Sequence, residues 1–237
     1  MQLTNLQFGT SPVVVHAQGH HEYKPLWPPI RDAFFNARPR TLSPPAGLTI
    51  VTCNNGHAAM GLLERSLDHL GLPYIVAGRG IEEWKNARDK PRALIEALAS
   101  IDTPLTMYAD SRDAIVIDDP CVVGGRFAAF GCELLFSADR MNWPPLPEFQ
   151  RYEDALAAGV KTDFRYLNGG MWIGRTGFCR RFFADVAAAP PVEEAPDSEQ
   201  GLLKQLLPRY REEVRLDYRC EIFQNIGFVA KPILELR

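Results

Sequence analysis

The sequence predicts an α/β fold with a mainly parallel, doubly wound sheet, because apolar segments of strand length alternate with amphipathic segments of helical length. The alternation becomes regular after the first 47 residues, where strands expected at 48–53, 73–77 and 105–109 are separated by helices at 57–70 and 92–100. In both helices the apolar residues recur every three or four positions, which is the spacing of one buried face. The composition, 46% hydrophobic and 23% charged, is that of an ordinary globular protein.

The remaining segments are less regular but fit the same class. We expect a short strand at residues 12–16 and a short helix at 30–36. The later elements expected are strands at 132–138, 166–174, 214–217, 220–224 and 232–236, and helices at 176–188 and from 196 onward. Prolines and a glycine in residues 38–47 predict a linker. No internal repeat is found, and the length of 237 residues allows one large domain or two small ones.

Charge and targeting signals narrow the class of protein. The net charge of -3 gives no reason to expect nucleic acid or an anionic membrane surface as a partner. No apolar run approaches the ~20 residues that a membrane-spanning helix needs, and residues 1–5 lack the features of a signal peptide. The five cysteines never form a Cys-x-x-Cys pair, which favours reduced thiols. We therefore expect a cytoplasmic protein with no membrane partner.

Two carboxylates interrupt the apolar stretch around residue 110. Asp110 and Asp113 lie between the strand predicted at 105–109 and a second apolar run at 114–117. If the first strand ends at Ala109, both acids lie in a tight turn at its carboxyl end, where open α/β sheets bind ligands. Paired carboxylates suit Mg²⁺ or Mn²⁺, which take further ligands from substrate phosphates. From the spacing alone, a solvated turn with two surface acids explains the pattern equally well.

Several segments, taken in order, resemble one family. They are Tyr-Ala-Asp-Ser-Arg-Asp at 108–113, Leu-Phe-Ser-Ala at 135–138 with Trp-Pro at 143–144, Tyr-Leu-Asn-Gly-Gly-Met-Trp-Ile-Gly at 166–174, Asp-Ser-Glu-Gln at 197–200 and Phe-Gln-Asn at 223–225. From Leu48 to the C-terminus the chain resembles the glycosyltransferase domain of the procollagen lysyl hydroxylases. The resemblance implies that residues 1–237 form a single domain with a GT-A type nucleotide-sugar transferase fold and a Rossmann-like donor-binding half. It also implies transfer of a hexose from a UDP-sugar, with Mn²⁺ (or Mg²⁺), to a hydroxyl acceptor of the hydroxylysine or sugar type.

The order of the segments suggests a circular permutation. In the family, a strand ending in Val-Ile-His-Gly-Asn-Gly follows the Phe-Gln-Asn strand, and its histidine is the third metal ligand. Here the chain ends soon after Phe-Gln-Asn, whereas Pro-Val-Val-Val-His-Ala-Gln-Gly at 12–19 resembles the missing strand. We predict that residues 1–37 are a permuted segment carrying the metal ligand His16, that 38–47 join the former termini, and that 48–237 form the donor- and acceptor-binding core. Permutation is tolerated where termini lie close together at the surface.

The resemblance therefore assigns Asp110, Asp113 and His16 as metal ligands. A lone histidine at a strand end is more often a core residue, which is the alternative for His16. His20 and His21 could provide the third ligand instead, although their predicted loop favours solvated side chains.

On the donor side, the resemblance implies that Trp84 stacks on uracil and that Thr52, at the end of the first strand, contacts the nucleotide. It also places Lys90 at the diphosphate as a point charge and Ser111 in the same donor site. The structural alternatives are an aromatic residue at the core edge for Trp84 and a solvated side chain for Lys90. Arg112 replaces an aromatic residue of the family, which puts one contact to the base or ribose in doubt.

On the acceptor side, the resemblance implies catalytic roles for Asp197 and Glu199 and a cleft lined by Asn168 and Trp143. The pattern Asp-x-x-Gln before an apolar helix equally fits a capping box at Asp197, and structural roles are open for Asn168 and Trp143. We therefore predict a metal-dependent hexosyltransferase. The alternative is a nucleotide-sugar-binding protein of the same fold that does not catalyse transfer.

Overall fold

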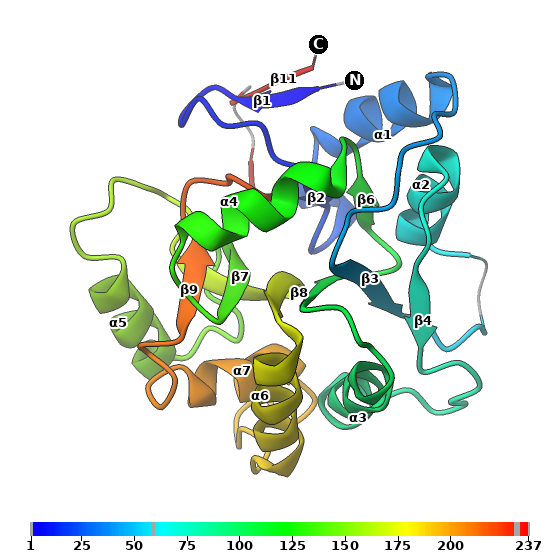
Figure 1. Cartoon of the computed structure of the whole chain (residues 1–237). Coiled ribbons are helices and arrows are strands. Elements are labelled where there is room, and N and C mark those ends of the chain that lie inside the picture. Colours follow the sequence, from blue (N-terminus) through cyan, green and yellow to red (C-terminus); the bar gives the residue numbers. More distant parts are fainter. Residues whose placement is uncertain (1, 58–59, 230–232, 237) are drawn as a thin grey trace.

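The centre of the fold is a six-stranded mixed sheet, which confirms the predicted α/β class (Figure 1). The computed structural model describes residues 2–57, 60–229 and 233–236. In their order across the sheet, the strands are β4 (Ile75–Ala77), β3 (Leu48–Cys53), β5 (Leu105–Ala109), β8 (Tyr166–Arg175), β7 (Leu134–Asp139) and β9 (Val214–Asp217). The parallel group of β4, β3 and β5 forms the Rossmann-like half that the sequence predicts.

The strand β8 departs from the predicted parallel arrangement, because it runs antiparallel to both β5 and β7. Residues 140–165 keep the chain at one end of the sheet, so that Tyr166 at the start of β8 pairs with Asp139 at the end of β7. A parallel strand would instead need a crossover to the opposite end. The expectation of a mainly parallel sheet is therefore confirmed by β4, β3 and β5 and by the pair β7 and β9, and β8 is the one antiparallel strand of this sheet among the described residues.

Two smaller sheets bring the N-terminal segment into the fold. The strand β2 (Val14–His16) lies between β10 (Phe223–Asn225), to which it is parallel, and β6 (Ala114–Val116), to which it is antiparallel. The strand β1 (Leu3–Asn5) pairs antiparallel with β11 (Leu234–Leu236), so the two ends of the chain lie side by side (Figure 1). The strand β2 from the N-terminal part of the chain and the strand β10 from the C-terminal part therefore lie in one small sheet with β6, which follows Asp113.

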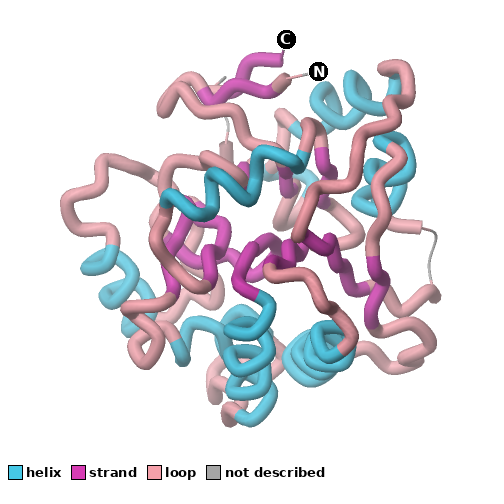
Figure 2. Tube along the Cα trace, in the orientation of Figure 1, coloured by secondary structure: helices cyan, strands magenta, loops and turns pink. Residues whose placement is uncertain are grey.

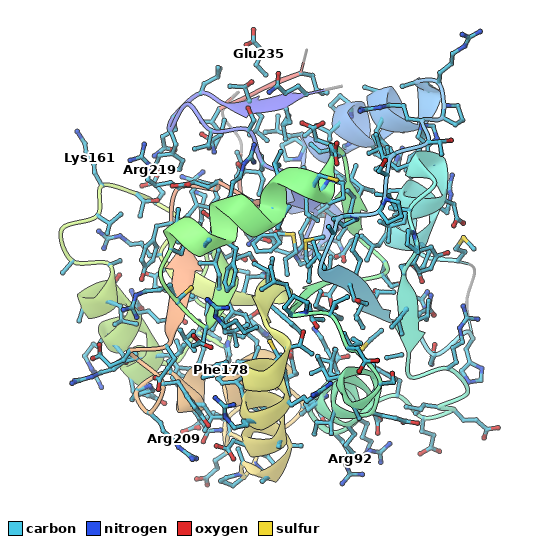
Figure 3. The ribbon with its side chains drawn as sticks, viewed as in Figure 1. Arg92, Lys161, Phe178, Arg209, Arg219 and Glu235 are labelled. Carbon is cyan, nitrogen blue, oxygen red and sulfur yellow. The ribbon has the colours of Figure 1, made fainter. Side chains whose placement is uncertain are left out.

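Helices cover both faces of the central sheet. They are α1 (Trp27–Asn36), α2 (Leu62–Leu70), α3 (Asn86–Ala99), α4 (Val123–Ala129), α5 (Pro147–Leu156), α6 (Thr176–Ala188) and α7 (Glu199–Leu206), with 3-10 turns at His21–Tyr23 and Pro120–Val122. One face packs against α3, α6 and α7, and the other carries α1, α2, α4 and the small sheet of β2 (Figures 1 and 2). Each face has its own buried apolar cluster. Charged side chains such as Arg92 and Arg209 point outward at the periphery (Figure 3).

Some elements differ from the sequence prediction. The pattern does not predict β1, α4 or α5. Of these, β1 and α4 are short, and α4 contains two glycines. The helix α2 begins at Leu62 rather than at 57, and residues 58–59 of that prediction lie outside the described residues. The helix α3 begins before its predicted start at residue 92, because the Asp89 carboxylate accepts a hydrogen bond from Lys85 N–H (2.7 Å) and stabilises an additional first turn.

Two expectations from the sequence, the absence of a membrane-spanning helix and the reduced state of the cysteines, can be compared with the structure. None of the helices in the described residues is long and apolar enough to cross a membrane. All five cysteines are free thiols. The cytoplasmic location itself stays a prediction.

A buried ion pair fixes α7 against the rest of the fold. Lys204 Nζ lies 2.7 Å from Glu153 Oε2 of α5, and both side chains are almost fully buried. Lys204 also donates to Asn142 Oδ1 (2.7 Å), and the second oxygen of Glu153 accepts the backbone N–H of Leu167 on β8. The pair therefore holds together α5, α7, β8 and the loop that leads to Trp143.

We expect Lys204→Met to lower the free energy of unfolding by about 3–5 kcal/mol, because it leaves the Glu153 carboxylate buried without its counter-charge. The control is Arg209→Met, which removes the exposed pair with Asp185 and should change stability by about 0–1 kcal/mol. Urea unfolding of both variants measures the difference. Equal effects of the two substitutions would contradict the role given to the buried pair.

Candidate active site

The turn between β5 and β6 places two carboxylates at the carboxyl end of the central sheet. Strand β5 ends at Ala109, as the sequence predicts, and Asp110 N–H then donates to the carbonyl of Gly170 on β8 (2.8 Å). A Cβ on Gly170 would lie 2.2 Å from His16 Cε1 and 2.8 Å from Asp110 Oδ2. The glycine therefore leaves the space in which His16 and the turn meet.

His16, Asp110 and Asp113 come together although His16 is distant in sequence. His16 Nε2 lies 3.7 Å from Asp110 Oδ2 and 3.2 Å from Asp113 Oδ1. One candidate ligand atom from each residue lies within 4.8 Å of the other two. Among the described residues, this is the only group of three His, Cys, Asp or Glu side chains close enough to hold a metal ion.

The tautomer of the neutral His16 ring is fixed by Asn225. Asn225 Nδ2 donates to the carbonyl of Ala138 (2.8 Å) and to Ser137 Oγ (3.1 Å), so its Oδ1 faces His16 Nδ1 at 2.9 Å. Nδ1 is therefore the donor, and Nε2 of the neutral ring presents its lone pair to the two carboxylates. A second-shell hydrogen bond of this kind is typical of histidines that bind metals.

The electrostatics of the cluster favour a cation between its members. Burial alone would lower the pKa of His16, but the carboxylates of Asp113 and Asp110 raise it to about 9. Burial alone would raise the pKa of Asp113, but His16 lowers it. One imidazole nitrogen and two carboxylates are a ligand set that fits Mn²⁺ or Mg²⁺, provided that the cation displaces the proton on His16.

His20 and His21 are the alternative third ligands that the sequence leaves open, and His20 is not part of this cluster. His20 lines the neighbouring cleft, but its side chain is exposed and pairs with Glu22 (3.7 Å). The side chain of His21 lies outside the described part of the chain.

Lys90 is buried beside the cluster, so the solvated alternative for this residue is wrong. Its Nζ lies 3.0 Å from Asp110 Oδ1, 3.3 Å from the carbonyl of Gly169 and 3.4 Å from Glu199 Oε2. Burial alone would lower the pKa of Lys90, but Asp110 and Glu199 raise it above its usual value. The lysine therefore carries a fixed positive charge next to the candidate metal site.

Glu199 is the first residue of α7 and is 6% exposed. One carboxylate oxygen contacts Lys90, and the other, Oε1, has no hydrogen-bond partner. Burial raises the pKa of Glu199 to about 7, although Lys90 counteracts the rise. A carboxyl group with this pKa can accept or give up a proton near neutral pH.

Two clefts meet at this cluster. The Trp84 cleft, of about 430 Å³, extends toward Asn54, Asn55 and Arg112. The Trp143 cleft, of about 530 Å³, extends in another direction toward the side chains of Tyr23, Asp139, Asn168, Asp197 and Phe228. The residues common to both clefts are Asn86, Lys90, Asp110 and Asp113. A ligand that reaches from one cleft to the other must therefore pass the candidate metal ligands.

Of the predicted donor residues, three line a cleft and one does not. Trp84 is half-buried and lines the Trp84 cleft, where its Nε1 donates a hydrogen bond to Asn86 Oδ1 (2.6 Å). Ser111 also lines this cleft, with its hydroxyl bound to Glu64 (2.8 Å). Lys90 lies at the junction. The structure does not bring the Thr52 side chain into either cleft, because it is fully buried and its hydroxyl donates to the Ala109 carbonyl (2.8 Å).

The predicted acceptor-side residues all line the Trp143 cleft. Trp143 is 53% exposed, and its carbonyl accepts a hydrogen bond from Gln200. Asn168 is buried between Asp139, to which it donates, and Gly170 N–H, from which it accepts. The capping alternative for Asp197 is wrong, because Ser198 is the N-cap of α7 and accepts from Gly201 N–H (3.0 Å), which leaves Asp197 exposed to the cleft.

Sequence reasoning missed two cleft residues, Asp139 and Gln18. Asp139 ends β7 at the same edge of the sheet as Asp110, so the rule that selected Asp110 could have found it. It is buried, and burial raises its pKa. Gln18 lies two positions after His16, inside the 12–19 segment that resembles the family strand, so that resemblance could have found it.

Comparison with known proteins gives a family. A model of the PLOD GT domain matches residues 46–235. The human multifunctional procollagen lysine hydroxylase and glycosyltransferase LH3 is 29% identical over an alignment of 217 residues, and the match covers 85% of this chain and 28% of that protein. The procollagen-lysine,2-oxoglutarate 5-dioxygenase of Drosophila melanogaster is 27% identical over an alignment of 158 residues, and the match covers 61% of this chain and 21% of that protein. The chain thus spans less than a third of the length of these curated relatives.

Solved structures give weaker likenesses. A crystal structure of glucosyl-3-phosphoglycerate synthase from M. tuberculosis has a TM-score of 0.41 at 13% identity and covers 90% of this chain and 78% of its own. A second, in complex with Mn²⁺, UDP-glucose and phosphoglyceric acid, has a TM-score of 0.36 at 14% identity, with 92% and 78% covered. Both TM-scores are too low to bear on the fold or the site.

Most residues of the candidate active site lie within the part of the chain that the family model matches. The matched residues include Lys90, Asp110, Asp113 and Glu199, whereas His16 lies outside them. The mixed α/β sheet with carboxylates after β5 agrees with the α/β class expected from sequence. Because the match extends over nearly all of the chain after the linker, the chain belongs to the PLOD GT domain family.

Proposed function

We propose that this chain is a metal-dependent glycosyltransferase that moves a hexose from a UDP-sugar to a hydroxyl acceptor. The observation that carries the proposal is the position of His16, Asp110 and Asp113 at the junction of two clefts. A nucleotide-sugar has its diphosphate between its base and its sugar, so it matches a site with charged groups at the centre and a cleft on either side. Family membership supports the same reaction class.

The charged centre suits a diphosphate leaving group. His16 Nε2 and one oxygen from each of Asp110 and Asp113 would hold Mn²⁺ (or Mg²⁺), which when bound supplies positive charge against the charge that builds up on UDP. Lys90 provides a second positive charge from the protein, and its contacts with Asp110 and Glu199 fix its position.

The Trp84 cleft suits the nucleotide. The Trp84 ring offers an aromatic face, and the side chains of Asn54 and Asn55 offer amide groups at the end of β3. Base–aromatic stacking contributes roughly 1–3 kcal/mol in nucleic-acid complexes. Arg112, which replaces a family aromatic, is exposed at the same cleft and adds positive charge near the ribose and phosphates.

The Trp143 cleft suits the sugar and the acceptor. Glu199 presents an unpartnered carboxylate oxygen there, so it is our choice for the group that takes the proton from the acceptor hydroxyl. Asp197, exposed on the same wall, positions the acceptor, and Trp143 and Asn168 line its path. The acceptor is of the hydroxylysine or sugar type, as the family resemblance implies.

A nucleotide-sugar-binding protein without transfer activity is the second candidate. The Trp84 cleft and the metal cluster would serve binding equally well. A space of about 530 Å³ beyond the metal cluster, with a carboxyl group of near-neutral pKa, favours transfer, since binding of the nucleotide alone needs neither.

We also propose that the chain is a circular permutation of the family domain, with residues 38–47 as the joining linker. Three observations support it. The family match begins only at residue 46. The strand β2, which carries His16, is inserted between β6 and β10. The chain ends pair as β1 and β11, with Leu3 opposite Leu236, which is the proximity that permutation requires.

The decisive experiment measures UDP release from a panel of UDP-hexoses with and without Mn²⁺. We expect turnover that depends on the metal, and its loss in Asp110→Asn and Asp113→Asn, because each variant removes one charged ligand. The exposed Asp102→Asn is the matched control and should retain full activity. Metal-dependent binding of UDP-sugars without turnover would favour the binding protein, and unchanged activity in both ligand variants would contradict the metal site.

We expect kcat/KM to depend on the ionisation of Glu199. Because burial raises its pKa to about 7, the fraction of deprotonated base falls as pH drops below that value, and kcat/KM should fall by about tenfold per pH unit there. Glu199→Gln should lower kcat by about 100-fold or more and should abolish this acidic limb. A pH–rate profile of the wild type and the variant tests the assignment, and a variant that retains the limb would contradict it.

A further inference from the structure

A buried carboxylate from α2 lies behind the turn that carries Asp110 and Asp113. Glu64 is in the first turn of α2 and is 2% exposed. Ser111 Oγ lies 2.8 Å from both of its carboxylate oxygens, and Asn54 Nδ2 donates to Oε1 (2.8 Å). Among the described residues, no lysine, arginine or histidine forms an ion pair with this carboxylate. A buried acid whose partners are neutral is costly, which points to a role beyond packing.

The hydrogen bonds around Glu64 have one consistent direction. Asn54 Oδ1 accepts from Gly56 N–H (3.0 Å), so the amide points its Nδ2 toward Glu64 and toward Ser111 Oγ (3.0 Å). Because a carboxylate can only accept, the Ser111 hydroxyl donates to Glu64. The orientations of Asn54 and Ser111 therefore depend on the Glu64 carboxylate. An acid in the first turn of a helix also interacts favourably with the helix dipole, but an exposed acid would do so without the cost of burial.

The first turn of α2 also holds the turn after β5 through its backbone. Leu63 N–H donates to the carbonyl of Ser111 (3.1 Å). A Cβ on Gly61, the N-cap of α2, would collide with Ser111 Oγ and with Glu64 Oε2. This glycine therefore permits the close approach of α2 to the residue that directly follows Asp110. Ser111 is itself 2% exposed, so α2 holds it by both its main chain and its side chain.

The position of Ser111 affects both carboxylates of the candidate metal site. Asp110 directly precedes Ser111 and Asp113 follows it by two residues, so a displacement of Ser111 would change the directions of both. The negative charge of Glu64 is buried and is therefore screened little by solvent. It favours a cation at the neighbouring cluster by Coulomb attraction. The position and the charge of Glu64 thus act in the same direction.

Resting on the proposed function, we infer that Glu64 is a positioning residue for the divalent metal ion. Its carboxylate orients Ser111, and thereby Asp110 and Asp113, and it adds negative charge behind them. Glu64 is not a member of the metal cluster itself, so it acts through these residues. Its effect should therefore be on how tightly the metal is bound and not on the transfer step.

Glu64→Gln tests the inference because it keeps the size of the side chain and removes its charge and one acceptor. Groups that hold metal ligands in place typically change metal affinity by about 10- to 100-fold when they are replaced. In a titration with UDP present, electron paramagnetic resonance of free Mn²⁺ should therefore show an affinity at least about tenfold weaker than that of the wild type. Glu96→Gln removes an exposed acid of α3, is the matched control and should change the affinity by less than about twofold.

Turnover distinguishes positioning from a structural effect. With a UDP-hexose that the wild type uses, the Mn²⁺ concentration for half-maximal rate should rise at least about tenfold in Glu64→Gln, whereas kcat at saturating Mn²⁺ should stay within about twofold. A partly unfolded variant would instead lose rate at every Mn²⁺ concentration. A measurement on the wild type remains if the variant does not fold. The amide resonance of Leu63, which is buried and lines neither cleft, should shift when Mg²⁺ is added to the protein with UDP.

The outcomes separate this inference from the proposed function. A Mn²⁺ affinity of Glu64→Gln equal to that of the wild type, a loss of kcat that saturating Mn²⁺ does not restore, or a Leu63 resonance that ignores bound Mg²⁺ would overturn the inference alone. Failure of the wild type to bind Mn²⁺ with UDP would overturn the proposed function and the inference together.

Discussion

The hydrogen bond between His16 Nδ1 and Asn225 Oδ1 is the interaction on which the geometry of the site depends. It joins the two ends of the sequence, since β2 and β10 lie side by side, and it determines which ring nitrogen faces the carboxylates of Asp110 and Asp113. Without it, the imidazole could rotate or change tautomer, and the cluster would retain two carboxylates alone. A site of this kind therefore requires the N-terminal segment to be folded in place.

The position of Asn225 is in turn fixed by the buried side chain of Asp217. Asp217, at the end of β9, accepts backbone N–H groups of Glu221, Ile222 and Phe223, and so holds the loop that leads into β10. Burial raises the pKa of Asp217 to about 6, although the three N–H donors counteract the rise. The edge of the main sheet and the cluster of His16, Asp110 and Asp113 are thus connected through one short loop.

The sequence predicts the elements around the Asp110–Asp113 turn well, because local signals determine them. The strand at Leu48–Cys53 and the helix at Thr176–Ala188 have the bounds that the apolar pattern indicates. The side chain of Thr52 is misassigned because successive residues in a strand face opposite sides. Its hydroxyl lies inside the sheet, whereas its neighbour Cys53 lines the cleft.

Other parts of the site depend on contacts that no local pattern encodes. The burial of Lys90 results from Asp110, Gly169 and Glu199, which belong to three different elements. The antiparallel direction of β8 follows from a connection that stays at one end of the sheet. His16 could be related to the turn only through the family resemblance, since its contact with Asp113 requires the pairing of β2 with β6.

The central claim is that a residue from the N-terminal segment completes a metal site formed by a turn in the middle of the chain. Pulsed electron paramagnetic resonance of the Mn²⁺-loaded protein tests it most directly, because a bound imidazole nitrogen modulates the electron spin echo. The account predicts the coupling of one imidazole nitrogen, lost in His16→Gln and retained in His57→Gln, whose histidine is exposed. Tightly bound Mn²⁺ without nitrogen coupling in the wild type, or coupling that persists in His16→Gln, would contradict it.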